Sequence, residues 1–161
     1  RNKDRCTSSH NTVCIDGTEQ NDLPADLFSM PEQTFAKKIK FDSNCFIGEH
    51  YGYKANLGIT HQRKIYLDRK TITISDRLIG KVLIKNAYIN LILDPNVLVN
   101  TDEQYLRLSS SNVELITNIP TSDSIIGECY VARGYGERVK SNKIQYKINP
   151  KTEVKVQFSL V

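Results

Sequence analysis

The chain has 161 residues, of which 39% are hydrophobic, 25% are charged and 8% are aromatic, and its formal net charge is +4. This length predicts one domain, residues 1–161, that buries a core without a disulfide or a metal, and its many β-branched residues exclude a disordered chain. Basic residues are dispersed except at Lys37, Lys38 and Lys40, whereas nucleic-acid binders concentrate them among aromatic residues, so we expect no nucleic-acid partner.

Period-two alternation of apolar and polar residues is the main signal along the chain. It predicts strands near residues 11–15, 34–41, 44–52, 59–67, 71–78, 81–93, 97–99, 104–109, 112–118, 124–132, 135–140, 142–149 and 154–160, about a dozen once neighbouring ranges merge. Turn residues separate these ranges, as at 68–70, 94–96, 118–120, 141–142 and 149–151. We therefore expect an all-β fold, an antiparallel two-sheet β-sandwich of the supersandwich or jelly-roll-like type.

Some ranges carry more specific expectations. Alternation over 34–41 predicts a half-buried strand, and alternation over 143–148 places Ile144, Tyr146 and Ile148 on the inner face. Residues 78–92 combine helical spacing with β-branched side chains, and we favour a strand there. The apolar stretch from Leu78 to Leu93 is interrupted by lysines and asparagines, so no membrane span is expected. Residues 18–31 are expected to form an irregular loop.

The four cysteines show no C-x-x-C spacing, which argues against a zinc ribbon. A disulfide between Cys6 and Cys14 is one alternative. Free thiols are the favoured one, because Cys14 lies in an apolar run where a cysteine serves as a small buried hydrophobe. The chain has neither an initial Met nor a visible secretory signal, so we expect it to be part of a longer protein.

Residues 9–17 read Ser-His-Asn-Thr-Val-Cys-Ile-Asp-Gly, a polar segment that leads into an apolar strand and an Asp-Gly turn. A histidine at a strand start is most often a hydrogen-bonded structural residue, and the alternative for His10 is a ligand or catalytic role. Arg63 has the geometry to bind a carboxylate with two donors, but a cross-strand pair with Asp76 is equally compatible with the sequence. Arg133 and Arg138 flank a glycine-containing bend and are candidates for contact with an acidic sugar.

Three segments, in order, resemble motifs of the heparinase II/III-like family. Residues 9–20 resemble its "HNTV-x-(V/I)DG-x-(D/E)Q" segment. Residues 50–53, 58–65 and 76–78 are similar to its "GY…G-(V/I)-x-H-x-R…(V/I)-x-D-x-L" hairpin, and residues 135–139 are similar to its "YGE" strand. These motifs span nearly the whole chain. On this resemblance, the chain is identified as a member of the family.

The resemblance implies that residues 1–161 are the C-terminal β-sandwich of a polysaccharide lyase. Its partner would be an N-terminal (α/α) toroid, absent from this chain, and the cleft between them would take an anionic, uronic-acid-containing polysaccharide for β-elimination. In the family, Tyr and His transfer the protons, and the toroid and an upstream histidine-rich segment supply them, so this chain alone is expected to be inactive. The parent is expected to be a bacterial periplasmic or secreted protein, with a cytoplasmic location left open.

The resemblance also assigns site residues. His10 matches the third ligand of a zinc site whose other ligands lie upstream, so this chain is expected to hold no cofactor itself, and zinc is expected only in the full-length parent. From the residues themselves rather than from the resemblance, Arg133 and Arg138 are the expected substrate-binding residues, and no catalytic residue is assigned within the chain. His61 is expected on the surface or packed within the sheet.

Two other functions compete with the lyase interpretation. One is a freestanding carbohydrate-binding module, against which the absence of Trp counts, because such modules commonly expose aromatic platforms. The other is a structural domain of a capsule or exopolysaccharide-biosynthesis protein. The polysaccharide and the mode of cleavage are not encoded in these residues.

Overall fold

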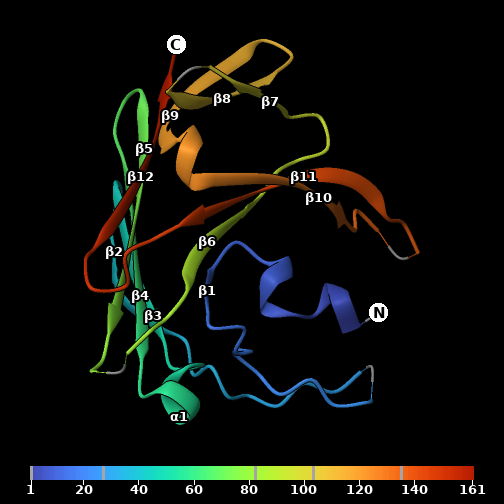
Figure 1. The fold of residues 1–161 in the computed structure, drawn as a ribbon, viewed down its shortest axis with the longest axis vertical. Helices are drawn as coiled ribbons and strands as arrows, with labels where there is room; N and C mark the ends of the chain where they lie inside the picture. The colour runs from blue at the N-terminus through green and yellow to red at the C-terminus, as the bar shows by residue number, and fades with distance from the viewer. Residues whose placement is uncertain (1, 27, 82, 103, 135) are drawn as a thin grey trace.

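The part of the chain that the structure describes forms twelve antiparallel strands in two sheets, with little helix (Figure 1). The computed structural model describes residues 2–26, 28–81, 83–102, 104–134 and 136–161. The strands are β1 Val13–Ile15, β2 Lys37–Phe41, β3 Cys45–His50, β4 Thr60–Leu67, β5 Thr71–Ile79, β6 Ala87–Ile92, β7 Leu98–Thr101, β8 Tyr105–Ser110, β9 Val113–Pro120, β10 Ser124–Val131, β11 Val139–Lys147 and β12 Val154–Leu160. The helices are the one-turn α1 Lys54–Leu57 and the 3-10 turns η1 Asn2–Asp4, η2 Thr7–Ser9 and η3 Thr121–Asp123.

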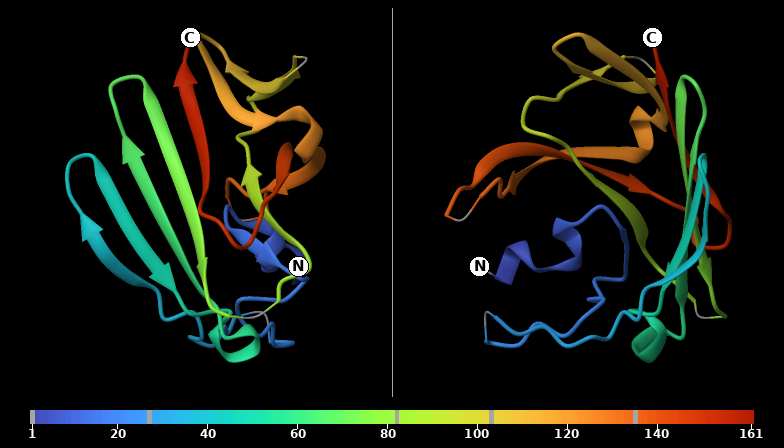
Figure 2. Two further views of the ribbon diagram at one scale, coloured as in Figure 1. Left: turned by 60° about the vertical axis from the view of Figure 1, so that its left-hand side comes forward. Right: turned by 180° about the vertical axis from the view of Figure 1, so that it is seen from behind.

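The two sheets differ in size, and the chain passes from one to the other at the connections β1–β2, β5–β6, β6–β7, β9–β10 and β11–β12. The smaller sheet has the order β1-β6-β11-β10, and the larger has the order β2-β3-β4-β5-β12-β9-β8-β7. Figure 2 shows β2 to β5 and β12 side by side, with the N-terminal segment beside the strands of the smaller sheet. The predicted two-sheet antiparallel sandwich is confirmed. Among the described residues, no helix has the length and apolar character needed to cross a membrane.

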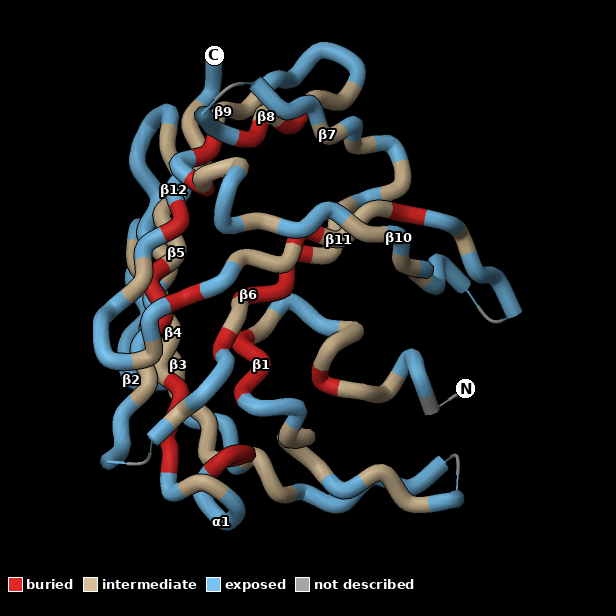
Figure 3. Tube along the Cα trace, viewed as in Figure 1, coloured by how far each residue is buried: buried red, intermediate tan, exposed pale blue. Residues whose placement is uncertain are grey.

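The core follows from the alternation of the strands, because alternate side chains of a strand point to opposite faces. As predicted, Ile144 and Ile148 are buried and Tyr146 packs against them. Figure 3 shows buried segments on β1, on β6 and along the strands that face them. The remaining buried core residues come from both sheets: Val13, Ile15, Tyr53, Ile59, Ala87, Ile89, Leu91, Leu106, Leu108, Ile119 and Val156.

The expectation of a half-buried strand over 34–41 is wrong. Phe35 has a positive φ of 42°, which ends the extended backbone, so β2 begins only at Lys37. All five residues of β2 are exposed, because it is the edge strand of the larger sheet. Its lysines suit that position, since charged side chains protect an edge from pairing with other chains.

Two other predicted ranges are corrected. The range 81–93 contains a strand only from Ala87, because the Asp16 carboxylate accepts the backbone amides of Lys85 (3.2 Å) and Asn86 (2.7 Å) and holds a bend before β6. The turn expected at 141–142 does not form, since Ser141 and Asn142 pair with β10 inside the continuous strand β11. Residues 136–138 lie in a turn and loop rather than in a "YGE" strand, and Tyr135 lies outside the described residues.

Candidate functional site

His10 lies on an exposed segment between η2 and β1. Its backbone amide donates to the Thr7 carbonyl (3.2 Å), and its carbonyl accepts the Thr12 amide (2.9 Å). No side chain in the described ranges forms a hydrogen bond or ion pair with its imidazole ring. The structure therefore presents His10 with both ring nitrogens available to another molecule or domain.

The backbone after His10 is held firmly against the smaller sheet. The Asn11 side-chain oxygen accepts the Ile92 amide (2.5 Å), and the Thr12 carbonyl accepts the Asn90 amide (2.9 Å). These bonds extend the pairing of β1 with β6, in which Val13 lies opposite Ile89. Because two β6 amides bind this segment, His10 sits at a defined position beside the end of β6.

Arg133 and Arg138 come from the loop between β10 and β11, far from His10 in sequence but close to it in space. The Arg133 Nη2 atom binds both carboxylate oxygens of Asp94, at 3.0 and 2.9 Å. The Arg138 Nη2 atom binds Asp4 Oδ1 at 3.0 Å, and its guanidinium carbon lies 4.7 Å from the centre of the Tyr130 ring. This stacking is a cation–π contact, which fixes the plane of the guanidinium.

Two adjoining pockets connect these residues. One, of about 290 Å³, is lined by His10, Asp4, Tyr130 and Arg138, and the other, of about 430 Å³, by His10, Asp94 and Arg133. The two share Ser9, His10, Ile92 and Val131. We name this region the His10 face and define it as Asp4, His10, Asp94, Tyr130, Arg133 and Arg138.

The charges of the His10 face are paired but accessible. Two arginines face two aspartates, and the Arg133 and Asp94 side chains are 47% and 55% exposed. The Asn96 amide and then Arg133 hold the pKa of Asp94 below its ordinary value. Exposed ion pairs contribute little to stability because water competes for both partners. The separation of Asp4 and Asp94 from the arginines is therefore expected to cost little stability.

The zinc role expected for His10 depends on ligands outside this chain. Within the described ranges, no group of three or more His, Cys, Asp or Glu side chains is placed to hold a metal ion. The two acids of the His10 face, Asp4 and Asp94, are engaged by Arg138 and Arg133. The zinc role of His10 therefore stays a prediction about the longer protein.

A cluster that contains two histidines lies within the larger sheet, and we name it the sheet network: His50, His61, Arg63 and Asp76, of which His61 and Asp76 are buried. His61 is 2% exposed; its Nε2 lies 2.6 Å from Asp76 Oδ1, and its Nδ1 lies 2.9 Å from His50 Nε2. Arg63 donates to both oxygens of Asp76, at 2.7 and 2.9 Å. Of the two alternatives considered for Arg63, the structure shows the cross-strand pair with Asp76. His61 packs within the sheet rather than on the surface.

Sequence reasoning missed the contact between His50 and His61. The two residues pair directly across β3 and β4, but the ten residues between them include the helical turn α1, so spacing alone does not reveal the register. Burial, and then the charges of His61 and Arg63, lower the pKa of His50 to about 4. Burial alone would raise the pKa of Asp76, but hydrogen bonds from His61 and Arg63 outweigh it and lower that pKa.

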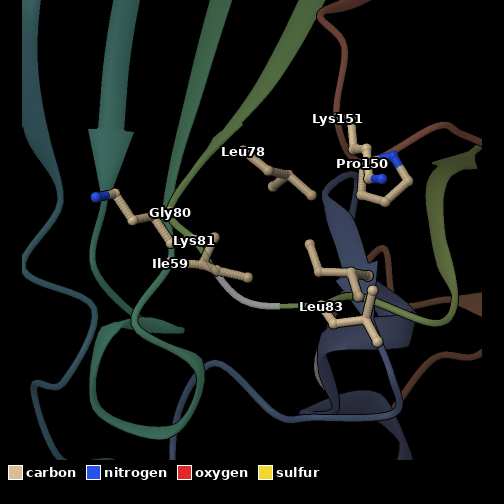
Figure 4. Close-up of a pocket in the computed structure, with 8 residues that line it drawn as sticks. Ile59, Leu78, Gly80, Lys81, Leu83, Pro150 and Lys151 are labelled. Carbon is tan, nitrogen blue, oxygen red and sulfur yellow. The ribbon is translucent and has the colours of Figure 1, made fainter.

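A separate pocket, of about 380 Å³, lies beside the end of β5 (Figure 4). Its lining is aliphatic, with Ile59, Leu78, Leu83 and Ile84, apart from the exposed Lys81 and Lys151. It offers neither the paired arginines nor the histidine of the His10 face, so we do not place the functional site there.

Comparison with known proteins points to one family. The family model described as "Heparinase II/III-like, C-terminal" matches residues 1–158. The heparan sulfate lyase HepC from Pedobacter heparinus aligns with a TM-score of 0.68 and 15% identity, over 99% of this chain and 25% of that chain. A heparinase III of Bacteroides origin aligns with a TM-score of 0.71 and 19% identity, over 100% of this chain and 25% of that one.

At these identities the structural similarity shows the fold. The chain spans 25% of the length of each solved neighbour, so it corresponds to one part of a larger protein in both cases. A sequence search of curated proteins found no match.

Proposed function

Because the chain belongs to the heparinase II/III-like C-terminal family, we propose that its His10 face forms one wall of a cleft that binds an anionic polysaccharide. An N-terminal (α/α) toroid of the same protein would form the opposite wall and supply the remaining groups for β-elimination. The solved neighbours support this proposal: they are named as a heparan sulfate lyase and a heparinase III, and in each the matching domain is a quarter of the chain.

One observation carries the proposal: three residues singled out separately in the sequence line adjoining pockets. His10 precedes the first strand, whereas Arg133 and Arg138 follow the tenth, and yet His10 shares a pocket with each arginine. Loops carry binding residues on a rigid scaffold in many proteins. The fold therefore brings these three loop residues together at one surface.

The chemistry of the His10 face suits an acidic sugar. Each arginine binds an exposed carboxylate of this chain, so its guanidinium is oriented to hold a carboxylate or sulfate of a ligand that takes that carboxylate's place. Tyr130 is 53% exposed and offers an aromatic face beside Arg138 for the apolar side of a pyranose ring. His10 adds an exposed imidazole, whose ring nitrogens can form hydrogen bonds with the sugar.

A zinc role for His10 belongs to the same proposal. In the longer protein, His10 would complete a set of ligands whose other members lie upstream, and zinc bound there would fix the His10 segment against them. A His10→Ala variant of the longer protein is then expected to lose bound zinc, measured by elemental analysis. Unchanged zinc content would remove His10 from the ligand set.

The test of the proposed function compares this chain with the longer natural protein that contains it. Heparan sulfate or alginate is added, and the absorbance of the unsaturated uronide product is followed. We expect activity from the longer protein, none from the chain alone, and a large loss in the His10→Ala variant of the longer protein. Lyase activity from the chain alone, or full activity in that variant, would contradict the proposal.

The alternative of a freestanding carbohydrate-binding module has one observation in its favour, the exposed Tyr130 with Arg138 stacked on it. Under that alternative the isolated chain would bind an oligosaccharide with micromolar affinity. If the His10 face is only one wall of a cleft, binding by the isolated chain is expected to be much weaker. Calorimetric titration with a heparin hexasaccharide separates the two functions.

A further inference from the structure

We propose that Arg63 is a positioning residue for the His10 face: it holds the Asn11 carbonyl, and the buried His50–His61–Asp76 chain holds Arg63. The inference rests on the proposed function for its purpose, because the segment that Arg63 holds is the one that carries His10. The contact itself is independent of that function. The Arg63 Nη1 atom donates to the Asn11 carbonyl at 2.5 Å.

The first step is the anchoring of Arg63 on Asp76. The Asp76 side chain is fully buried and the Arg63 side chain is 18% exposed. Arg63 Nε and Nη2 each donate to one carboxylate oxygen, and strands β4 and β5 place the two residues directly opposite each other. This two-point contact fixes the guanidinium plane, so the third nitrogen, Nη1, points in a defined direction.

The second step is the orientation of Asp76 by the histidines. The Gly52 amide donates to His50 Nδ1 (3.3 Å), so the proton of neutral His50 lies on Nε2, which donates to His61 Nδ1. His61 then carries its proton on Nε2 and donates to Asp76 Oδ1. A single ordered series of donors thus runs from the β3–α1 turn to the carboxylate that holds Arg63.

The third step is the effect of Arg63 on the His10 segment. Arg63 belongs to the larger sheet, whereas the side chain of Asn11 binds the Ile92 amide of the smaller sheet. Asn11 is therefore fixed from both sheets, through its carbonyl and through its side chain. Since His10 is the preceding residue, the Arg63 contact sets where its imidazole emerges between the two pockets.

The test uses a variant that separates positioning from folding. A lysine at position 63 keeps a cation beside Asp76, but it cannot bind Asp76 at two points and reach the Asn11 carbonyl as well. We expect Arg63→Lys to leave the overall unfolding transition nearly unchanged. It should speed hydrogen exchange of the Thr12 and Ile92 amides about tenfold or more, the factor expected for loss of a charge-assisted hydrogen bond.

Arg107→Lys is the matched control, because Arg107 is likewise a strand arginine that makes two side-chain contacts with carboxylate groups, here of Asp102 and Glu114, but it lies on β8. It should leave exchange at Thr12 and Ile92 unchanged. The proposal is overturned if Arg63→Lys does not change exchange at those amides, or speeds exchange equally across β8 and β9. An Arg63→Ala variant extends the test, with a larger increase expected at the same amides if it folds.

A second measurement separates this inference from the proposed function. A heparin hexasaccharide is titrated into the unsubstituted longer protein and into its Arg63→Lys and Arg107→Lys variants. Weaker binding only in Arg63→Lys supports both ideas. Altered exchange at Thr12 and Ile92, with no hexasaccharide binding to any variant, would preserve the positioning role and reject the polysaccharide function.

Discussion

The protein contains the same pair of chemical groups, an arginine on an aspartate, in two contrasting regions. In the sheet network, Asp76 is fully buried and accepts donors from both Arg63 and His61. On the His10 face, Asp94 and Arg133 are about half exposed and have water as a competing partner. The difference indicates that the buried pair maintains the structure, whereas the exposed pair is available for exchange with a ligand.

Removing the carboxylate of Asp76 or of Asp94 should show the largest difference between the two regions. Asp76→Ala leaves Arg63 and buried His61 without their acceptor, and we expect the free energy of unfolding to fall by about 3–5 kcal/mol, as for other broken buried pairs. Asp94→Ala should change it little. Urea denaturation of both variants measures the difference, and equal effects would show that the two regions are not energetically distinct.

Acid should weaken the sheet network before it affects the exposed pairs. The unfolded chain binds a proton at His50 near pH 6.5, but the folded protein does so only near pH 4. The unfolded state therefore binds more protons in this window, and stability should decrease as the pH falls from about 6.5 to about 4, by at most about 3 kcal/mol.

The His50→Gln variant is the control for that pH dependence. It retains an amide donor toward His61 but has no group that titrates, so the decrease between pH 6.5 and 4 should largely disappear. Asp76 contributes a separate loss only below about pH 3.8, because its pKa is lowered in the folded protein. An unchanged slope in His50→Gln would assign the effect to other groups.

On the exposed side, the largest expected effect is on binding rather than on stability. Arg138→Ala removes both the cation and its stack on Tyr130. In the longer protein we expect affinity for a heparin hexasaccharide to fall about tenfold, the effect of losing one charge-assisted contact. Calorimetry of Arg138→Ala beside Arg107→Ala checks this, and equal losses in both would indicate nonspecific attraction.

The smallest predicted effect has the opposite sign. Asp94→Asn removes the carboxylate that competes with an acidic sugar for Arg133. Affinity for the same hexasaccharide should therefore rise, by about two- to fivefold, since an exposed pair offers only weak competition. A decrease in affinity would mean that Asp94 itself contacts the sugar.

Much of the fold could be predicted from the sequence because burial on one face of a strand leaves a period-two pattern. The segment from Ile144 to Ile148 shows it: both isoleucines are buried as expected, and Lys147 is exposed. The pattern does not reveal whether a strand lies at the edge of a sheet, so the exposure of β2 was missed. It also does not reveal that the Asp16 side chain, some seventy residues away in sequence, holds the bend before β6.

In the candidate site too, local sequence identified individual residues, but it did not predict which of them lie close together. Residue type and family motifs singled out His10, Arg133 and Arg138, but their proximity depends on how β10 and β11 pair beside β6. The pairing of His50 with His61 depends on strand register across the turn at α1. Contacts of this kind are set by tertiary packing, and local sequence carries no direct signal for them.

The most direct test of the central claim follows the histidine side chains by NMR while a heparin hexasaccharide is added to the protein. The two-region account predicts that the His10 ring signals shift with increasing ligand, whereas those of His50 and His61 do not. Shifts confined to His50 and His61, or none at His10 at saturating ligand, would contradict it and move the binding site away from the His10 face.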